Sequence, residues 1–146
     1  MKRPADINFV IGIGIFAVVA IAAYWFFWFA VPGVVQARMP ADPDFAVYSG
    51  YELAFPLPDA FVGIAALIGV IGLLNMKDWG FLVMLLAAGA TFFLGLEDLL
   101  FDLENRMFVP FNGAAGIELA IVLLIMSLGP VMTVLLWRQR KALINS

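Results

Sequence analysis

Four long stretches of this chain are almost entirely apolar and carry no charge in their middle, which limits the solvent in which the chain can fold. They cover about 9–31, 57–75, 80–101 and 116–137. Each has about the 20 residues that a helix needs to cross a bilayer. We therefore predict an all-α integral membrane protein, an antiparallel bundle of four transmembrane helices in a single membrane domain over 1–146.

The composition supports a membrane location independently of the four stretches. The chain is 64% hydrophobic and 13% charged, whereas soluble domains have about half apolar and about a quarter charged residues. A soluble fold of this size buries only about two thirds of the surface that its unfolded chain exposes. Lipid is therefore the expected solvent.

Two residue types that carry much of protein chemistry are missing. The chain has no cysteine and no histidine. This excludes disulfides, thiolate metal sites and cysteine nucleophiles, and also the commonest general base and the commonest ligand of zinc, copper and iron. Any site for an ion must use oxygen ligands, and no cofactor is expected.

The charges between the stretches are divided unevenly, and this predicts the orientation. One side carries Lys2, Arg3, Lys77, Arg138, Arg140 and Lys141, with the acids Asp6 and Asp78. The other side carries nine acids against Arg38 and Arg106. Loops rich in Lys and Arg usually remain on the cytoplasmic side of a membrane. We therefore expect both termini in the cytoplasm and the protein in a plasma or inner membrane.

The connections between the stretches differ in length. The expected outer loop over 32–56 is long and partly apolar, so it is predicted to lie on the bundle as a cap. A tight turn at 76–79 joins the second and third spans. The second outer loop, over 102–115, contains Pro110 and the turn formers Asn112-Gly113.

Carboxylates gather where the spans meet the outer side. Asp98 and Asp102 are four residues apart and share a helix face, whereas Glu97 points about 100° away. Asp59 and Glu118 each enter a span near its N-terminus, where capping and the helix dipole explain an acid. Glu97 and Asp98 are different, because they lie near a C-terminus that disfavours anions. Arg106 is a candidate salt-bridge partner for Asp102.

Three kinds of chemistry could use such a group of acids. It could bind a hard cation through carboxylate oxygens, it could carry protons if crowding raises one pKa, or it could hold the amine or hydroxyl of an amphipathic ligand. The sequence leaves the identity of any metal open. Without histidine or a nucleophile motif, hydrolytic chemistry is disfavoured, and the chain is more readily a binding protein than an enzyme.

One segment resembles a known family. Glu52-Leu53-Ala54-Phe55-Pro56-Leu57-Pro58, followed by a helix, a short basic-aromatic turn and a helix ending in acids, is similar to the EXPERA-domain membrane proteins. These include the sigma-2 receptor and the emopamil-binding sterol isomerases. The resemblance implies a bundle with a pocket for sterols and cationic amphiphiles, in which Glu52 faces the ligand. The first span has no ionisable residue between Asp6 and Arg38 and the chain has no histidine, so isomerase activity is not implied.

The leading hypothesis is a non-enzymatic protein that binds a lipid or another hydrophobic or amine-bearing molecule in a pocket near the outer leaflet. Its expected polar end is Glu52, Asp59 and Asp98, and its expected apolar wall is Tyr48, Tyr51, Phe55 and Trp25. Glu97, Asp102 and Glu118 form a further acidic group that is either structural or cation-binding.

Two alternatives remain open. One is an accessory or scaffold subunit that packs against a membrane-protein partner or a second copy of itself. The other is proton or cation transport by an oligomer, although no charge lies in the middle of any span, where a conducting pathway usually needs polar groups. Membrane lipids are expected partners in every case, and nucleic acid is not.

Overall fold

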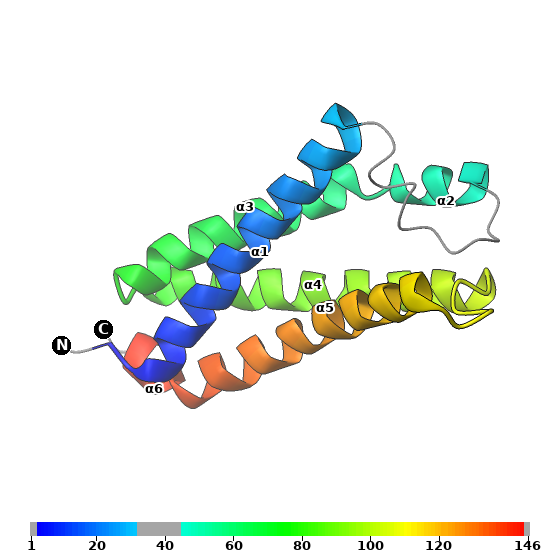
Figure 1. Cartoon of the computed structure of the whole chain (residues 1–146). Coiled ribbons are helices and arrows are strands. Elements are labelled where there is room, and N and C mark those ends of the chain that lie inside the picture. Colours follow the sequence, from blue (N-terminus) through cyan, green and yellow to red (C-terminus); the bar gives the residue numbers. More distant parts are fainter. Residues whose placement is uncertain (1–2, 32–44, 145–146) are drawn as a thin grey trace.

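A computed structural model describes residues 3–31 and 45–144, and every regular element in these ranges is a helix (Figure 1). The helices are α1 (Ala5–Ala30), α2 (Phe45–Glu52), α3 (Pro56–Leu74), α4 (Asp78–Glu104), α5 (Gly113–Arg138) and α6 (Arg140–Ile144). Helices α1, α3, α4 and α5 are long and apolar enough to cross a membrane. This confirms the predicted all-α fold, with four helices that could span a membrane, for the described residues.

Local signals in the sequence set the helix ends. Pro56 opens α3 at the position where a missing N–H is tolerated. The Asn112 side chain accepts a hydrogen bond from the Ala115 N–H at 3.0 Å and so caps α5. Helix α4 ends at Glu104, and Arg106 has a φ of 56°. The expected salt bridge from Arg106 to Asp102 is wrong, because the helix ends before the four-residue spacing can place both side chains on one face.

Two short helices accompany the four long ones. Helix α2 lies within the segment expected as the first outer loop, and α6 follows α5 after a one-residue break at Gln139. The first part of that loop, residues 32–44, lies outside the described residues.

One end of the bundle, here called the terminal end, brings together the start of α1 and the ends of α3 and α5 (Figure 1). Two hydrogen bonds join these segments. The Arg3 guanidinium donates to the Leu74 carbonyl at 2.8 Å, and the Gln139 amide donates to the Asp6 carboxylate at 2.8 Å. The opposite end is called the distal end below.

The hydrophobic core is concentrated towards the terminal end. Its fully buried side chains include Ile7, Leu73, Met84, Leu136 and Leu143. On α1 the buried residues all lie between Ile7 and Gly14. The first half of α1 is therefore packed into the bundle, whereas its second half has no buried residue.

Helices α3 and α4 approach each other most closely where two glycines meet, just beside the turn that joins them. A Cβ atom added at Gly80 would contact the backbone of Gly72 and Leu73, and one added at Gly72 would contact the backbone of Gly80. Small residues allow this kind of close approach between helices in membranes. The pair therefore fixes the spacing of α3 and α4 at the terminal end.

Candidate ligand site

A cavity of about 430 Å³ lies between the distal halves of the helices. Ligand pockets in proteins usually measure about 300–1,000 Å³. All five of the helices α1 to α5 contribute side chains to its walls. The cavity is therefore large enough to hold one small molecule.

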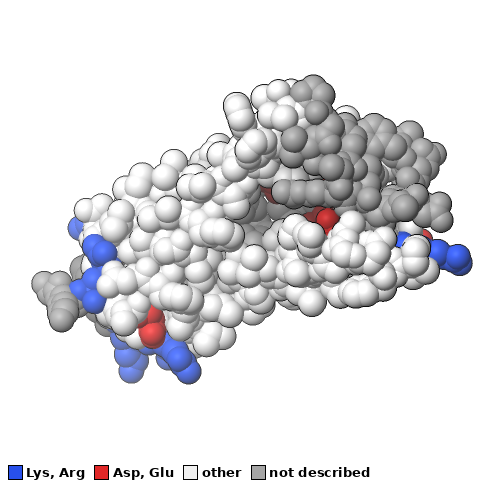
Figure 2. Space-filling model, viewed as in Figure 1, with Lys and Arg blue, Asp and Glu red and all other residues white. Residues whose placement is uncertain are grey.

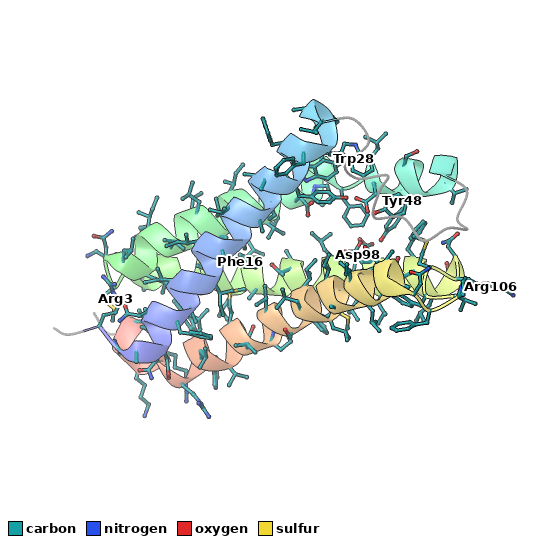
Figure 3. The ribbon with its side chains drawn as sticks, in the orientation of Figure 1. Arg3, Phe16, Trp28, Tyr48, Asp98 and Arg106 are labelled. Carbon is teal, nitrogen blue, oxygen red and sulfur yellow. The ribbon has the colours of Figure 1, made fainter. Side chains whose placement is uncertain are left out.

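The path of α1 explains why this space is open. Gly14 packs against Val70 of α3 and Met84 of α4, and beyond it α1 diverges from α5 (Figure 1). Figure 3 places Phe16 of α1 and Asp98 of α4 on opposite sides of the resulting space, with Tyr48 of α2 at its distal end. The cavity thus opens where α1 diverges from α5 beyond Gly14.

The cavity walls are polar at one end and apolar at the other. Carboxylates of Glu52, Asp59, Asp98 and Glu118 lie at the distal end, and Figure 2 shows acidic atoms inside a hollow of the surface. The apolar part continues along α5 to Leu128. Glu118 and Leu128 are ten residues apart, which corresponds to about 15 Å along a helix axis. The cavity is therefore elongated and amphipathic.

Three aromatic side chains donate hydrogen bonds to these carboxylates. The Tyr24 hydroxyl donates to Glu52 at 2.7 Å, and the Tyr51 hydroxyl donates to Asp98 at 3.1 Å. The Trp25 indole N–H donates to Asp59 at 2.9 Å. These bonds tie α1 to α2 and α3, and α2 to α4. They position the carboxylates with neutral donors, so they leave the negative charge in place.

Both tyrosines of α2 remain protonated donors. Burial, together with the negative charge of Asp98, raises the pKa of the Tyr51 hydroxyl. Burial and the nearby Glu52 carboxylate likewise raise the pKa of Tyr48. Ionising either hydroxyl would place a second negative charge beside an existing one. At neutral pH these groups can therefore donate hydrogen bonds and cannot neutralise the carboxylates.

The structure brings most of the predicted site residues to the cavity. Glu52, Asp59, Asp98, Tyr48 and Phe55 line it. Tyr51 and Trp25, expected in the apolar wall, are not lining residues and instead hold two of the carboxylates.

The further acidic group is divided by the fold. Glu118 lines the cavity, whereas Glu97 is exposed on another face of α4. Asp102 is only 3% exposed and does not line the cavity. Its buried Oδ2 atom has no hydrogen-bond partner in the described part of the chain. Asp102 lies close enough to Glu118 and Asp98 to interact with them electrostatically.

Sequence reasoning assigned no site role to most of the apolar lining residues, nor to Tyr24 and Thr91. Tyr24 lies in the last part of α1, at the start of an aromatic run. Such a run is typical of a membrane interface, so no sequence signal distinguishes Tyr24. Phe16 and Thr91 lie deeper, and the Thr91 hydroxyl donates to the Ala87 carbonyl at 2.9 Å. The periodicity of α4 does place Thr91 on the face of Asp98, seven residues away.

No group of three or more Asp, Glu, His or Cys residues in the ranges 3–31 and 45–144 could hold a metal ion. No family model, no curated protein and no solved structure matches the chain. The resemblance to the EXPERA-domain proteins therefore stays a prediction.

The hydrogen bond from Tyr51 to Asp98 can be tested with a change that preserves packing. The Tyr51 ring stacks on Phe101 with centroids 3.7 Å apart, and Tyr51→Phe keeps this stacking while it removes the hydroxyl. A hydrogen bond to a charged group stabilises a fold by about 1.5–3 kcal/mol. The bond from Tyr51 to Asp98 is only partly buried, so we expect a value near the lower end of this range. We expect thermal unfolding in nanodiscs to begin a few degrees lower. An unchanged unfolding temperature would show that the bond contributes no stability.

Proposed function

We propose that this protein is a non-enzymatic membrane protein that binds one amphipathic small molecule with a protonated amine. The observation that carries the proposal is the cavity itself, whose polar end has four carboxylates. No Lys or Arg is among the lining residues found in the described ranges. The ligand would place its amine among the carboxylates and its apolar body along α1 and α5.

Electrostatics favours a cationic ligand. Carboxylates removed from water are costly unless they are paired with opposite charge or protonated. Tyr24, Trp25 and Tyr51 supply hydrogen bonds to Glu52, Asp59 and Asp98, but they supply no positive charge. A protonated amine would supply both, since its N–H groups form charge-assisted hydrogen bonds with carboxylates.

The shape of the cavity favours an amphiphile over a small hydrophilic amine. Beyond the carboxylates, the walls are formed by apolar side chains such as Phe16, Leu124 and Leu128. Burying a CH₂ group in such surroundings contributes about 0.8 kcal/mol. A chain or ring system attached to the amine would therefore add much of the affinity.

The proposal includes an orientation. The four long helices would form an antiparallel bundle with both termini in the cytoplasm and the carboxylates near the outer leaflet, in a plasma or inner membrane. Helix α2 would cover the polar end of the ligand. The uneven distribution of basic residues supports this orientation, and the resemblance of the segment from Glu52 to Pro58 to EXPERA-domain proteins supports a pocket near Glu52.

Dodecylamine is a suitable probe, because an alkyl amine is protonated at neutral pH as lysine is. We expect native mass spectrometry of the protein released from nanodiscs to show saturable binding of one dodecylamine. Dodecanol has the same chain without the charge and should bind much more weakly. Equal retention of amine and alcohol, or uptake of many copies without saturation, would contradict the proposal.

A further inference from the structure

The terminal end of the bundle carries a second group of charges, far from the cavity. Its basic residues in the described ranges are Arg3, Lys77, Arg138, Arg140 and Lys141, and its acids are Asp6 and Asp78. Figure 2 shows several groups of blue Lys and Arg atoms at this end, and blue atoms also at the distal end. The excess of basic residues at the terminal end is what the sequence uses to predict the orientation. The contacts of each side chain show which of these residues have a structural role.

Two of the five cations have structural roles. The Arg3 guanidinium donates to the Leu74 carbonyl at 2.8 Å, at the end of α3. The Arg140 guanidinium donates to the Trp137 carbonyl at 2.8 Å and lies 4.5 Å from the centre of the Trp137 ring. Both therefore satisfy carbonyl groups at helix C-termini, where positive charge is favourable.

The other three cations have no such role. Lys77, Arg138 and Lys141 are exposed, and none of their side chains forms a hydrogen bond or ion pair with the described part of the chain. The two acids offset only part of this charge and form no ion pair with these cations in the described ranges. Asp6 accepts from the Gln139 amide at 2.8 Å, and Asp78 accepts from the Trp79 backbone N–H at 2.7 Å. Because five described cations face two carboxylates here, the terminal end presents a net positive charge.

Exposed tryptophans place this charge at a definite depth. Trp79 and Trp137 are 41% and 57% exposed and stand next to Asp78 and Arg138 in the chain. Tryptophan at a helix end lies at the level of the lipid head groups. The junction of α5 and α6 is also held in place, because Leu143 of α6 is fully buried in the core.

We propose that Lys77, Arg138 and Lys141 bind the head group of an anionic phospholipid at the terminal end. A phosphodiester at head-group depth supplies the negative charge that this surface lacks, and each Lys or Arg near an anionic membrane surface contributes about 1 kcal/mol. This site is separate from the cavity and does not depend on the function proposed for it.

The test uses nanodiscs with equal parts of phosphatidylglycerol and phosphatidylcholine, and native mass spectrometry of the lipids that stay with the released protein. The wild-type protein is expected to retain phosphatidylglycerol preferentially. The triple variant Lys77→Gln, Arg138→Gln, Lys141→Gln should lose this preference by roughly fivefold for each charge removed. Arg106→Gln removes an exposed cation at the distal end and should leave the preference unchanged.

Three outcomes would overturn this inference. The triple variant could retain phosphatidylglycerol as the wild type does, or Arg106→Gln could reduce retention equally. Inorganic phosphate at millimolar concentration could also displace the lipid, which would identify a site for free phosphate. Dodecylamine binding by the triple variant is expected to be unchanged, so the outcome for this site is independent of the outcome for the cavity.

Discussion

The double variant Glu52→Gln, Asp98→Asn is expected to lose dodecylamine binding almost completely. Both side chains line the polar end of the cavity, and each would form a charge-assisted bond to the amine. Such bonds are worth about 1.5–3 kcal/mol each, so the loss of both should raise the Kd at least about a hundredfold. Titration in nanodiscs, read by native mass spectrometry, measures the change.

The amide replacements keep the surrounding hydrogen bonds. The Tyr24 and Tyr51 hydroxyls, which donate to Glu52 and Asp98, can still donate to an amide oxygen. The fold should therefore be retained while the negative charge is removed.

Glu97→Gln is the matched control. Glu97 is adjacent to Asp98 in the chain but exposed on another face of α4 and absent from the cavity wall. This variant should bind dodecylamine with wild-type affinity. If Glu97→Gln weakened binding as much as the double variant, the amine would be responding to the general negative potential, and the assigned carboxylates would not hold it.

Replacing Gly80 by valine is expected to produce the largest loss of stability. A Cβ atom at this position would contact the backbone of Gly72 and Leu73, and backbone atoms cannot move aside as a flexible side chain can. Overpacking of a well-packed core usually costs about 1–3 kcal/mol. Because Val adds two further methyl groups, α3 and α4 would have to separate and the cost should reach or exceed the upper part of this range.

Gly89→Ala provides the comparison for Gly80→Val. Gly89 lies on the same helix, and a Cβ atom there would have no neighbour within 4 Å. Its replacement should be neutral or stabilise the helix by up to about 1 kcal/mol. Thermal unfolding of both variants in nanodiscs tests the difference. Equal stability of the two would show that the contact between Gly72 and Gly80 does not set the spacing of the helices.

The four long apolar helices could be predicted from the sequence because hydropathy is a local property. A span must be apolar over its whole length, and α1, α3, α4 and α5 all meet this requirement. The expectation that Asp98 and Glu97 lie on different faces of the helix also follows from local geometry, since adjacent residues on a helix point in different directions. Asp98 lines the cavity and Glu97 is exposed.

The parts that escaped prediction depend on tertiary packing. The position of the cavity depends on α1 diverging from α5 beyond Gly14, which requires knowing that Gly14 packs on Val70 and Met84. Trp25 could be placed at the membrane interface, but its bond to Asp59 is a contact between residues 34 positions apart. Asp102 shared a predicted face with Asp98, yet α4 continues past the cavity before it reaches Asp102.

Native mass spectrometry of the protein gently extracted from its own membrane shows whether the cavity holds a natural ligand. We expect a discrete bound small molecule that carries a basic nitrogen, at one copy per chain. The double variant Glu52→Gln, Asp98→Asn, extracted in the same way, should lack this mass. A stoichiometric protein partner with no small molecule bound to the wild type would contradict the account and identify the chain as an accessory subunit.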